Sequence, residues 1–77
     1  MGWRVRVINA DWNTLLRLRK PLLALMPEHA LVVCAINTTK GVQVADPFGG
    51  LYWYTTNEFR QRYQNVAISV FRDNPFE

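Results

Sequence analysis

Apolar and polar residues alternate near both ends of the chain, as in strands that bury one face. Near the N-terminus, Trp3, Val5 and Val7 alternate with arginines, which predicts a strand over Val5–Ile8 with its valine face half-buried. Near the C-terminus, Val66–Phe71 alternates in the same way and predicts the last strand. Both ends of the chain are therefore expected to belong to a sheet.

Four further strands are predicted in the middle of the chain, where short apolar runs are bounded by proline, glycine or other turn residues. The run Ala30–Ile36 is apolar at every position, which favours a central strand that is covered on both faces. The four predicted strands are Leu22–Met26, Ala30–Ile36, Val42–Ala45 and Leu51–Tyr54.

Two short helices complete the pattern. Asp11 is an expected N-cap for a helix over Trp12–Arg19. Thr55 and Glu58 have the spacing of a capping box, which predicts a second helix that ends near Tyr63. The order β-α-β-β-β-β-α-β with short connections favours the α+β class, with one mainly antiparallel sheet and two short helices.

Length and composition limit the classes of function. The chain has 77 residues, a formal net charge of +3 and a single cysteine, so it is one domain or half-domain over residues 1–77 and has no internal disulfide. No metal-ligand spacing is present, and no cofactor is expected. No apolar run is long enough to cross a bilayer or to act as a signal peptide, so a cytoplasmic location is expected. The tail Asp73–Glu77 is expected to fray.

The two central strands form a predicted hairpin whose register can be counted from its loop. If the loop is Asn37–Lys40, a common four-residue length, Ile36 pairs with Gly41 and Asp46 lies opposite Leu31. Directly opposite residues share a face of the sheet. A loop that is one residue longer or shorter would therefore move Asp46 to the opposite face.

His29, the only histidine, lies two positions before Leu31, so in this register its side chain can meet that of Asp46. The carboxylate would then accept the Nδ1 proton of the imidazole and leave Nε2 to act as a general base. The alternative is a histidine bonded to the backbone and an aspartate that opens a turn before Pro47. Residue types alone favour this alternative, because nucleophilic catalysis needs a third group.

Several short motifs occur in an order and at a spacing that together are specific. They are Val5–Ile8, Asp11-Trp12-Asn13-Thr14-Leu15, Pro21-Leu22-Leu23-Ala24-Leu25, His29-Ala30-Leu31-Val32-Val33, Gly41-Val42-Gln43-Val44-Ala45-Asp46-Pro47, Gly50 and Glu58-Phe59. This series resembles the C-terminal half of the bacteriocin-processing cysteine peptidase domain, a papain-like domain of ABC exporters that cleaves double-glycine leaders. The resemblance implies a leader peptide as substrate, with His29 as general base and Asp46 as its orienting carboxylate.

The chain departs from that family in one large respect. The nucleophilic cysteine and the oxyanion-hole glutamine of the family lie well upstream of the histidine, in an N-terminal helical half. Here only 28 residues precede His29, and none of them is cysteine or glutamine. Cys34 is expected to be a small core residue in mid-strand, on the face opposite His29. The chain therefore resembles the sheet half of a papain-like fold, incomplete without a Cys-bearing helical segment or a second chain.

Two other functions remain open. One is a non-catalytic peptide-docking domain of an exporter, which would meet the membrane only indirectly. The other is a small basic nucleic-acid-binding module with Trp3, Tyr52, Trp53 and Tyr54 as stacking groups, although the basic residues form no dense run. The half-domain hypothesis also predicts exposed apolar side chains where the missing half would pack. The candidates are Trp12, Leu16, Phe48, Trp53 and Phe71.

Overall fold

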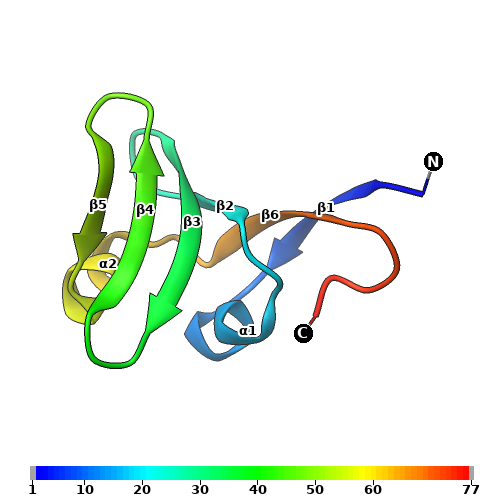
Figure 1. Cartoon of the computed structure of the whole chain (residues 1–77), viewed down its shortest axis with the longest axis horizontal. Coiled ribbons are helices and arrows are strands. Elements are labelled where there is room, and N and C mark those ends of the chain that lie inside the picture. Colours follow the sequence, from blue (N-terminus) through cyan, green and yellow to red (C-terminus); the bar gives the residue numbers. More distant parts are fainter. Residues whose placement is uncertain (1, 77) are drawn as a thin grey trace.

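Short connections fold residues 2–76, the part of the chain that the computed structural model describes, into one six-stranded sheet (Figure 1). All strand pairs are antiparallel, and the order across the sheet is β1-β6-β2-β3-β4-β5. The predicted α+β class is confirmed. The strands are β1 (Arg4–Asn9), β2 (Leu22–Leu25), β3 (Ala30–Asn37), β4 (Gly41–Asp46), β5 (Gly50–Tyr54) and β6 (Val66–Phe71).

Helix α2 (Thr56–Arg62) begins at the capping box that the sequence predicts. The Thr55 hydroxyl accepts a hydrogen bond from the backbone N–H of Glu58 at 3.1 Å, and the Glu58 carboxylate accepts one from the backbone N–H of Thr55 at 3.2 Å. This satisfies two backbone groups that a helix start leaves without partners. Phe59 and Tyr63, four positions apart, lie on one side of the helix and are both buried.

Helix α1 (Trp12–Arg17) is two residues shorter than predicted. Leu18 leaves the helix in an extended conformation, is fully buried and forms an isolated β-bridge with Phe76. The predicted fraying is therefore wrong for residues 73–76, because the tail pairs with the end of α1. Glu77 lies outside the described residues.

Both helices pack on the same face of the sheet. Leu15 of α1 and Phe59 of α2 are fully buried and belong to one hydrophobic cluster with the strands. Figure 1 shows the helices toward the lower end of the sheet, whereas β3 begins and β4 ends at its upper end. The strand residues of this core are Leu22, Ala24, Leu31, Val33, Val42, Val44 and Ala67.

The opposite face of the sheet is also apolar, and neither helix covers it. Val7 and Leu51, on the two edge strands, are 67% and 65% exposed. An antiparallel sheet with one solvated face normally alternates apolar with polar residues, so this face has the composition of a covered surface. One row of paired residues crosses all six strands on this face, in the order Val7, Ile68, Leu23, Val32, Ala45 and Leu51.

Two predictions about burial are wrong because apolar residues also lie on the sheet face that the helices do not cover. The alternation in β1 predicted that Val5 and Val7 face the core, but both are exposed. The register of β1 against β6 pairs Ile8 with the buried Ala67, so Ile8 faces the core instead. Strand β3 was expected to be covered on both faces, and Val32 on its outer face is only half-buried.

The β3–β4 hairpin departs from the counted register in two ways that cancel. Its loop has three residues, 38–40, so Asn37 pairs with Gly41, one position away from the prediction. A register shift between Val33 and Ala35 then makes Cys34 an extra residue on β3, which is a β-bulge. Beyond the bulge the pairing returns to the predicted register. Cys34 itself is half-buried and does not belong to the core.

Candidate functional site

His29 and Asp46 meet at the end of the sheet that lies away from the helices. The backbone N–H of Met26 donates to the carbonyl of His29 at 2.8 Å, which closes the turn from β2 into β3. Asp46 is the last residue of β4. His29 Nε2 lies 3.3 Å from Asp46 Oδ2, so the contact that the hairpin register predicted is present. The ring atom is Nε2, however, and the expectation that Nδ1 would contact the carboxylate is wrong.

The Asp46 carboxylate accepts three hydrogen bonds. Oδ1 accepts from the backbone N–H of Phe48 at 2.8 Å, and Oδ2 accepts from the Tyr52 hydroxyl at 3.0 Å as well as from His29 Nε2. The hydrogen bond from the Phe48 N–H is the main reason that the pKa of Asp46 lies below its ordinary value of 3.8. Burial raises this pKa, whereas Tyr52 and His29 lower it by smaller amounts. Asp46 thus opens a turn and contacts the histidine at once, so the two interpretations of its role do not exclude each other.

Two tyrosines extend this contact toward the core. The hydroxyl oxygens of Tyr52 and Tyr54 lie 3.2 Å apart. The Tyr52 hydroxyl therefore has two acceptors within reach, Asp46 Oδ2 at 3.0 Å and the Tyr54 hydroxyl oxygen, and the carboxylate is the stronger one. The Tyr54 hydroxyl, burial and Asp46 all raise the pKa of Tyr52, which keeps it a proton donor. The Tyr54 ring in turn packs against Phe59, with ring centres 6.3 Å apart.

Sequence reasoning missed Tyr52 as a partner of Asp46. A signal was available, because β5 returns beside β4 and Tyr52 pairs with Val44, two positions before Asp46. Residues two apart on a strand share a face, so counting the second hairpin would have placed Tyr52 beside the carboxylate.

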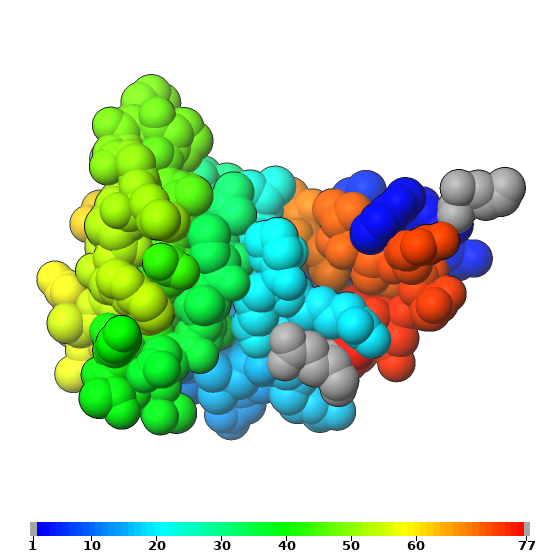
Figure 2. Space-filling view, in the orientation of Figure 1, coloured from blue at the N-terminus to red at the C-terminus, as the bar shows by residue number. Residues whose placement is uncertain are grey.

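Phe48 lies beside the histidine and is largely solvated. Its ring meets the His29 ring edge-on, with centres 6.1 Å apart, and the residue is 88% exposed. Figure 2 shows the β4–β5 loop, which carries Phe48, projecting at the upper left of the molecule. Of the five side chains predicted to be exposed, three are exposed, one is half-buried and one is buried. The exposed ones are Leu16, Phe48 and Trp53, Trp12 is half-buried, and the expectation is wrong for Phe71.

The described residues place a histidine and a carboxylate in contact but no cysteine beside them. Cys34 lies five positions along β3 from His29, a separation of about 16 Å on an extended strand. Its Sγ lies 4.0 Å from the carbonyl oxygen of Val32. Within residues 2–76, no group of three or more His, Cys, Asp or Glu side chains is placed to hold a metal ion. Over the same residues, no helix is both long enough and apolar enough to cross a membrane.

The aromatic residues considered for base stacking do not form one surface. Tyr52 pairs with the buried Val44 and so faces the core, and its ring packs against that of Tyr54. Trp53 follows Tyr52 on the strand and therefore faces the opposite side of the sheet, where it is 41% exposed. This separation weakens the nucleic-acid hypothesis.

Replacing Asp46 by Asn is expected to change the pH dependence of stability. Because the folded pKa of Asp46 is below 3.8, its ionised form stabilises the fold above about pH 3.8, and this contribution is lost as the pH falls through the folded pKa. The stability difference between wild type and the Asn variant should therefore be constant near pH 6 and shrink below pH 3.8, measured by urea unfolding. A difference that stays constant down to pH 2 would contradict the lowered pKa.

Comparison with known proteins adds a family and a fold. The model of the Peptidase C39 family matches residues 1–75. Among solved structures, the peptidase domain of ComA from Streptococcus mutans matches with a TM-score of 0.75 and 21% identity, and the match covers 91% of this chain and 64% of that chain. This chain therefore spans less than two thirds of the ComA domain. No curated protein matches the sequence. The family match confirms the resemblance seen in the sequence, and the structural match confirms the fold.

Proposed function

Because this chain belongs to the Peptidase C39 family, we propose that it supplies the histidine and the aspartate of a cysteine peptidase site that acts on leader peptides. His29 is the general base, and Asp46 orients it. The observation that carries this proposal is the 3.3 Å contact between His29 Nε2 and Asp46 Oδ2. The setting that fits this activity is the cytoplasmic side of a membrane exporter.

In this proposal the two ring nitrogens of His29 have different tasks. Nε2 carries the proton that Asp46 accepts, so in the neutral ring Nδ1 has a free lone pair. Nδ1 takes the proton of a cysteine thiol, and the thiolate attacks the scissile carbonyl carbon. The imidazolium then gives that proton to the leaving amine, and water hydrolyses the thioester. Asp46 stabilises the imidazolium while it exists.

The nucleophile in this proposal comes from a Cys-bearing helical segment, because Cys34 is the only cysteine of the chain and is remote from His29. Such a segment would contact the end of the sheet where His29 is accessible, with 28% of its side chain exposed. Phe48, exposed beside it, provides apolar surface for that contact. The part of the ComA peptidase domain that lies outside the structural match leaves room for a segment of this kind.

The experiment is a reconstitution. A helical segment that carries a cysteine, taken from a complete domain of the Peptidase C39 family, is fused ahead of residue 2, and cleavage of a double-glycine leader peptide is followed by mass spectrometry. The chain alone should not cleave the peptide. The fusion should cleave it, and replacing the cysteine of the fused segment should abolish cleavage. In both proteins, Cys34→Ser should leave the result unchanged, because Cys34 is remote from the base.

The same proteins test the alternative of a non-catalytic docking domain. That hypothesis predicts leader-peptide binding by a folded fusion without cleavage, and binding that survives His29→Ala. Cleavage by the chain alone that disappears in Cys34→Ser would contradict both interpretations, since it would make Cys34 the nucleophile.

A further inference from the structure

The sheet contains a gap between β2 and β6. These two strands pair only at Leu23 with Ile68 and at Ala24 with Ala67. Strand β6 continues beside β1 to Phe71, whereas β2 begins at Leu22 after Pro21, which has no backbone N–H to donate. From Val70 onward, the side of β6 that faces β2 therefore lacks a neighbouring strand within the described residues.

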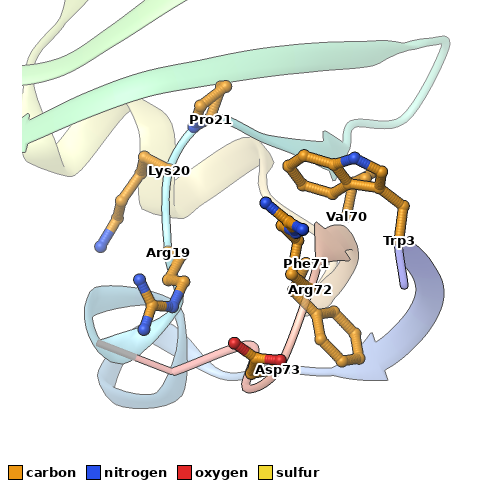
Figure 3. Close-up of a pocket in the computed structure, with 8 residues that line it drawn as sticks. All are labelled: Trp3, Arg19, Lys20, Pro21, Val70, Phe71, Arg72 and Asp73. Carbon is orange, nitrogen blue, oxygen red and sulfur yellow. The ribbon is translucent and has the colours of Figure 1, made fainter. Parts of the chain in front are cut away.

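Extending the register places residues 19–21 where that ladder would continue. Counting on from the observed pairs puts Pro21 opposite Val70 and Arg19 opposite Arg72. The backbone of Arg19 has left the ladder, since its N–H donates to the carbonyl of Pro75 at 2.8 Å. What remains is a groove of about 480 Å³ between the two segments. Figure 3 shows Arg19, Lys20 and Pro21 on one side of it and Trp3, Val70, Phe71 and Arg72 on the other.

The lining of the groove combines positive charge with apolar walls. Three cationic side chains line it against one carboxylate, that of Asp73, and the walls include Trp3, Pro21 and Val70. The cations are Arg19, Lys20 and Arg72.

Each of the three cations makes one contact that positions it. Arg19 Nε donates to the carbonyl of Asn74 at 2.9 Å, and the Arg72 guanidinium lies 5.5 Å from the centre of the exposed Trp3 ring. Lys20 Nζ donates to the carbonyl of Leu16 at 2.7 Å. Cations that are already positioned lose less conformational entropy when they bind an anion.

We propose that this groove binds an extended peptide that carries an acidic side chain next to an apolar one. The peptide backbone pairs with the side of β6 that lacks a neighbouring strand, at Val70–Phe71. In an antiparallel sheet, every second residue of a strand directs its N–H and C=O toward the neighbour on a given side. The acidic side chain lies between Arg19 and Arg72, and the apolar side chain packs against Trp3. A peptide fits better than a nucleic acid, because the groove offers a strand edge and only a short cluster of cations.

This site does not depend on His29 or Asp46. Strand β2 separates the two places, since Pro21 precedes it and the turn to His29 follows it. A binding experiment can therefore distinguish failure of this proposal from failure of the proposed peptidase function.

The test uses the full chain and two fluorescein-labelled pentapeptides, one with glutamate between valine and leucine and one with glutamine in its place. Binding is measured by fluorescence anisotropy, and the site is located by amide chemical-shift changes. The glutamate peptide should bind at least about tenfold more tightly than the glutamine peptide, with the largest shifts at Val70–Arg72. Arg72→Glu should remove this preference. Arg72→Lys should keep part of it.

A matched control separates the groove from general charge. Arg62→Glu changes the net charge by the same amount at an exposed position of α2 and should leave binding unchanged, as should His29→Ala. Equal binding of the two peptides, equal weakening by Arg62→Glu and Arg72→Glu, or shifts centred elsewhere would overturn the proposal. The proposal would also be overturned if oligothymidylate displaced the labelled peptide at a lower concentration than the unlabelled peptide does, because that result would identify a nucleic-acid site.

Discussion

In the reconstituted enzyme, His29→Ala is expected to lower kcat/KM for leader-peptide cleavage by about 10²–10⁴-fold, the usual contribution of a positioned general base. The chain has no second histidine that could replace the lost imidazole. Without Nδ1 as acceptor, the thiol keeps its proton and the leaving amine has no nearby donor. The measurement is the initial rate at substrate concentrations below KM, where it reports kcat/KM directly.

Two further variants test the order of contacts behind the base. In the proposed mechanism, Asp46→Asn removes the negative charge that stabilises the imidazolium, so this change should also lower kcat/KM strongly. Tyr52→Phe removes one of the three hydrogen bonds to Asp46. It should lower kcat/KM less than His29→Ala or Asp46→Asn does. Thermal unfolding of each variant checks that the fold is intact. A His29→Ala enzyme that retains activity within a few-fold of wild type would contradict the assignment of the base.

Phe59→Ala is expected to lower the free energy of unfolding by about 3–5 kcal/mol, the range for removing a buried aromatic ring. Phe59 is fully buried, and its ring contacts those of Trp12, Tyr54 and Tyr63 with centres 5.3–6.3 Å apart. A domain of this size has about 5–15 kcal/mol in total, so the variant is expected to be close to unfolding. Urea unfolding followed by circular dichroism measures the change.

Phe48 provides the matched control, because it is the same residue type in a different environment. Phe48 is 88% exposed, and Phe48→Ala should change the free energy of unfolding by less than about 0.5 kcal/mol. If Phe59→Ala and Phe48→Ala lower the free energy of unfolding by the same amount, the core does not lie between α2 and the sheet as described. Retained cleavage in the Phe48 variant would also show that its ring is not needed to hold His29.

Local signals in the sequence were sufficient to predict most of the elements. The caps at Asp11 and Thr55 and the alternation in β6 each involve residues close in the chain, and each is present in the structure. The face that β1 buries could not be read in this way. It depends on the register of β1 against β6, whose residues are about 60 positions distant, and the apolar Val5 and Val7 gave the wrong face.

The candidate site was reached by a count that contained two compensating errors. The hairpin loop is one residue shorter than assumed, and the bulge at Cys34 restores the register before His29. No residue type near Cys34 announces a bulge, so the sequence alone could not distinguish this outcome from a contact that fails. The choice of Nε2 over Nδ1 also depends on a ring orientation that only three-dimensional packing determines.

The bulge at Cys34 has a consequence for how the contact between His29 and Asp46 can be lost during evolution. If the bulge were lost and Cys34 paired in a regular ladder counted from Asn37 and Gly41, Asp46 would lie opposite Val32, and His29 and Asp46 would turn to opposite faces of the sheet. Both residues would still be present in an aligned sequence. A descendant of this kind would carry both residues at an unchanged spacing, so a census of site residues would count the contact as intact.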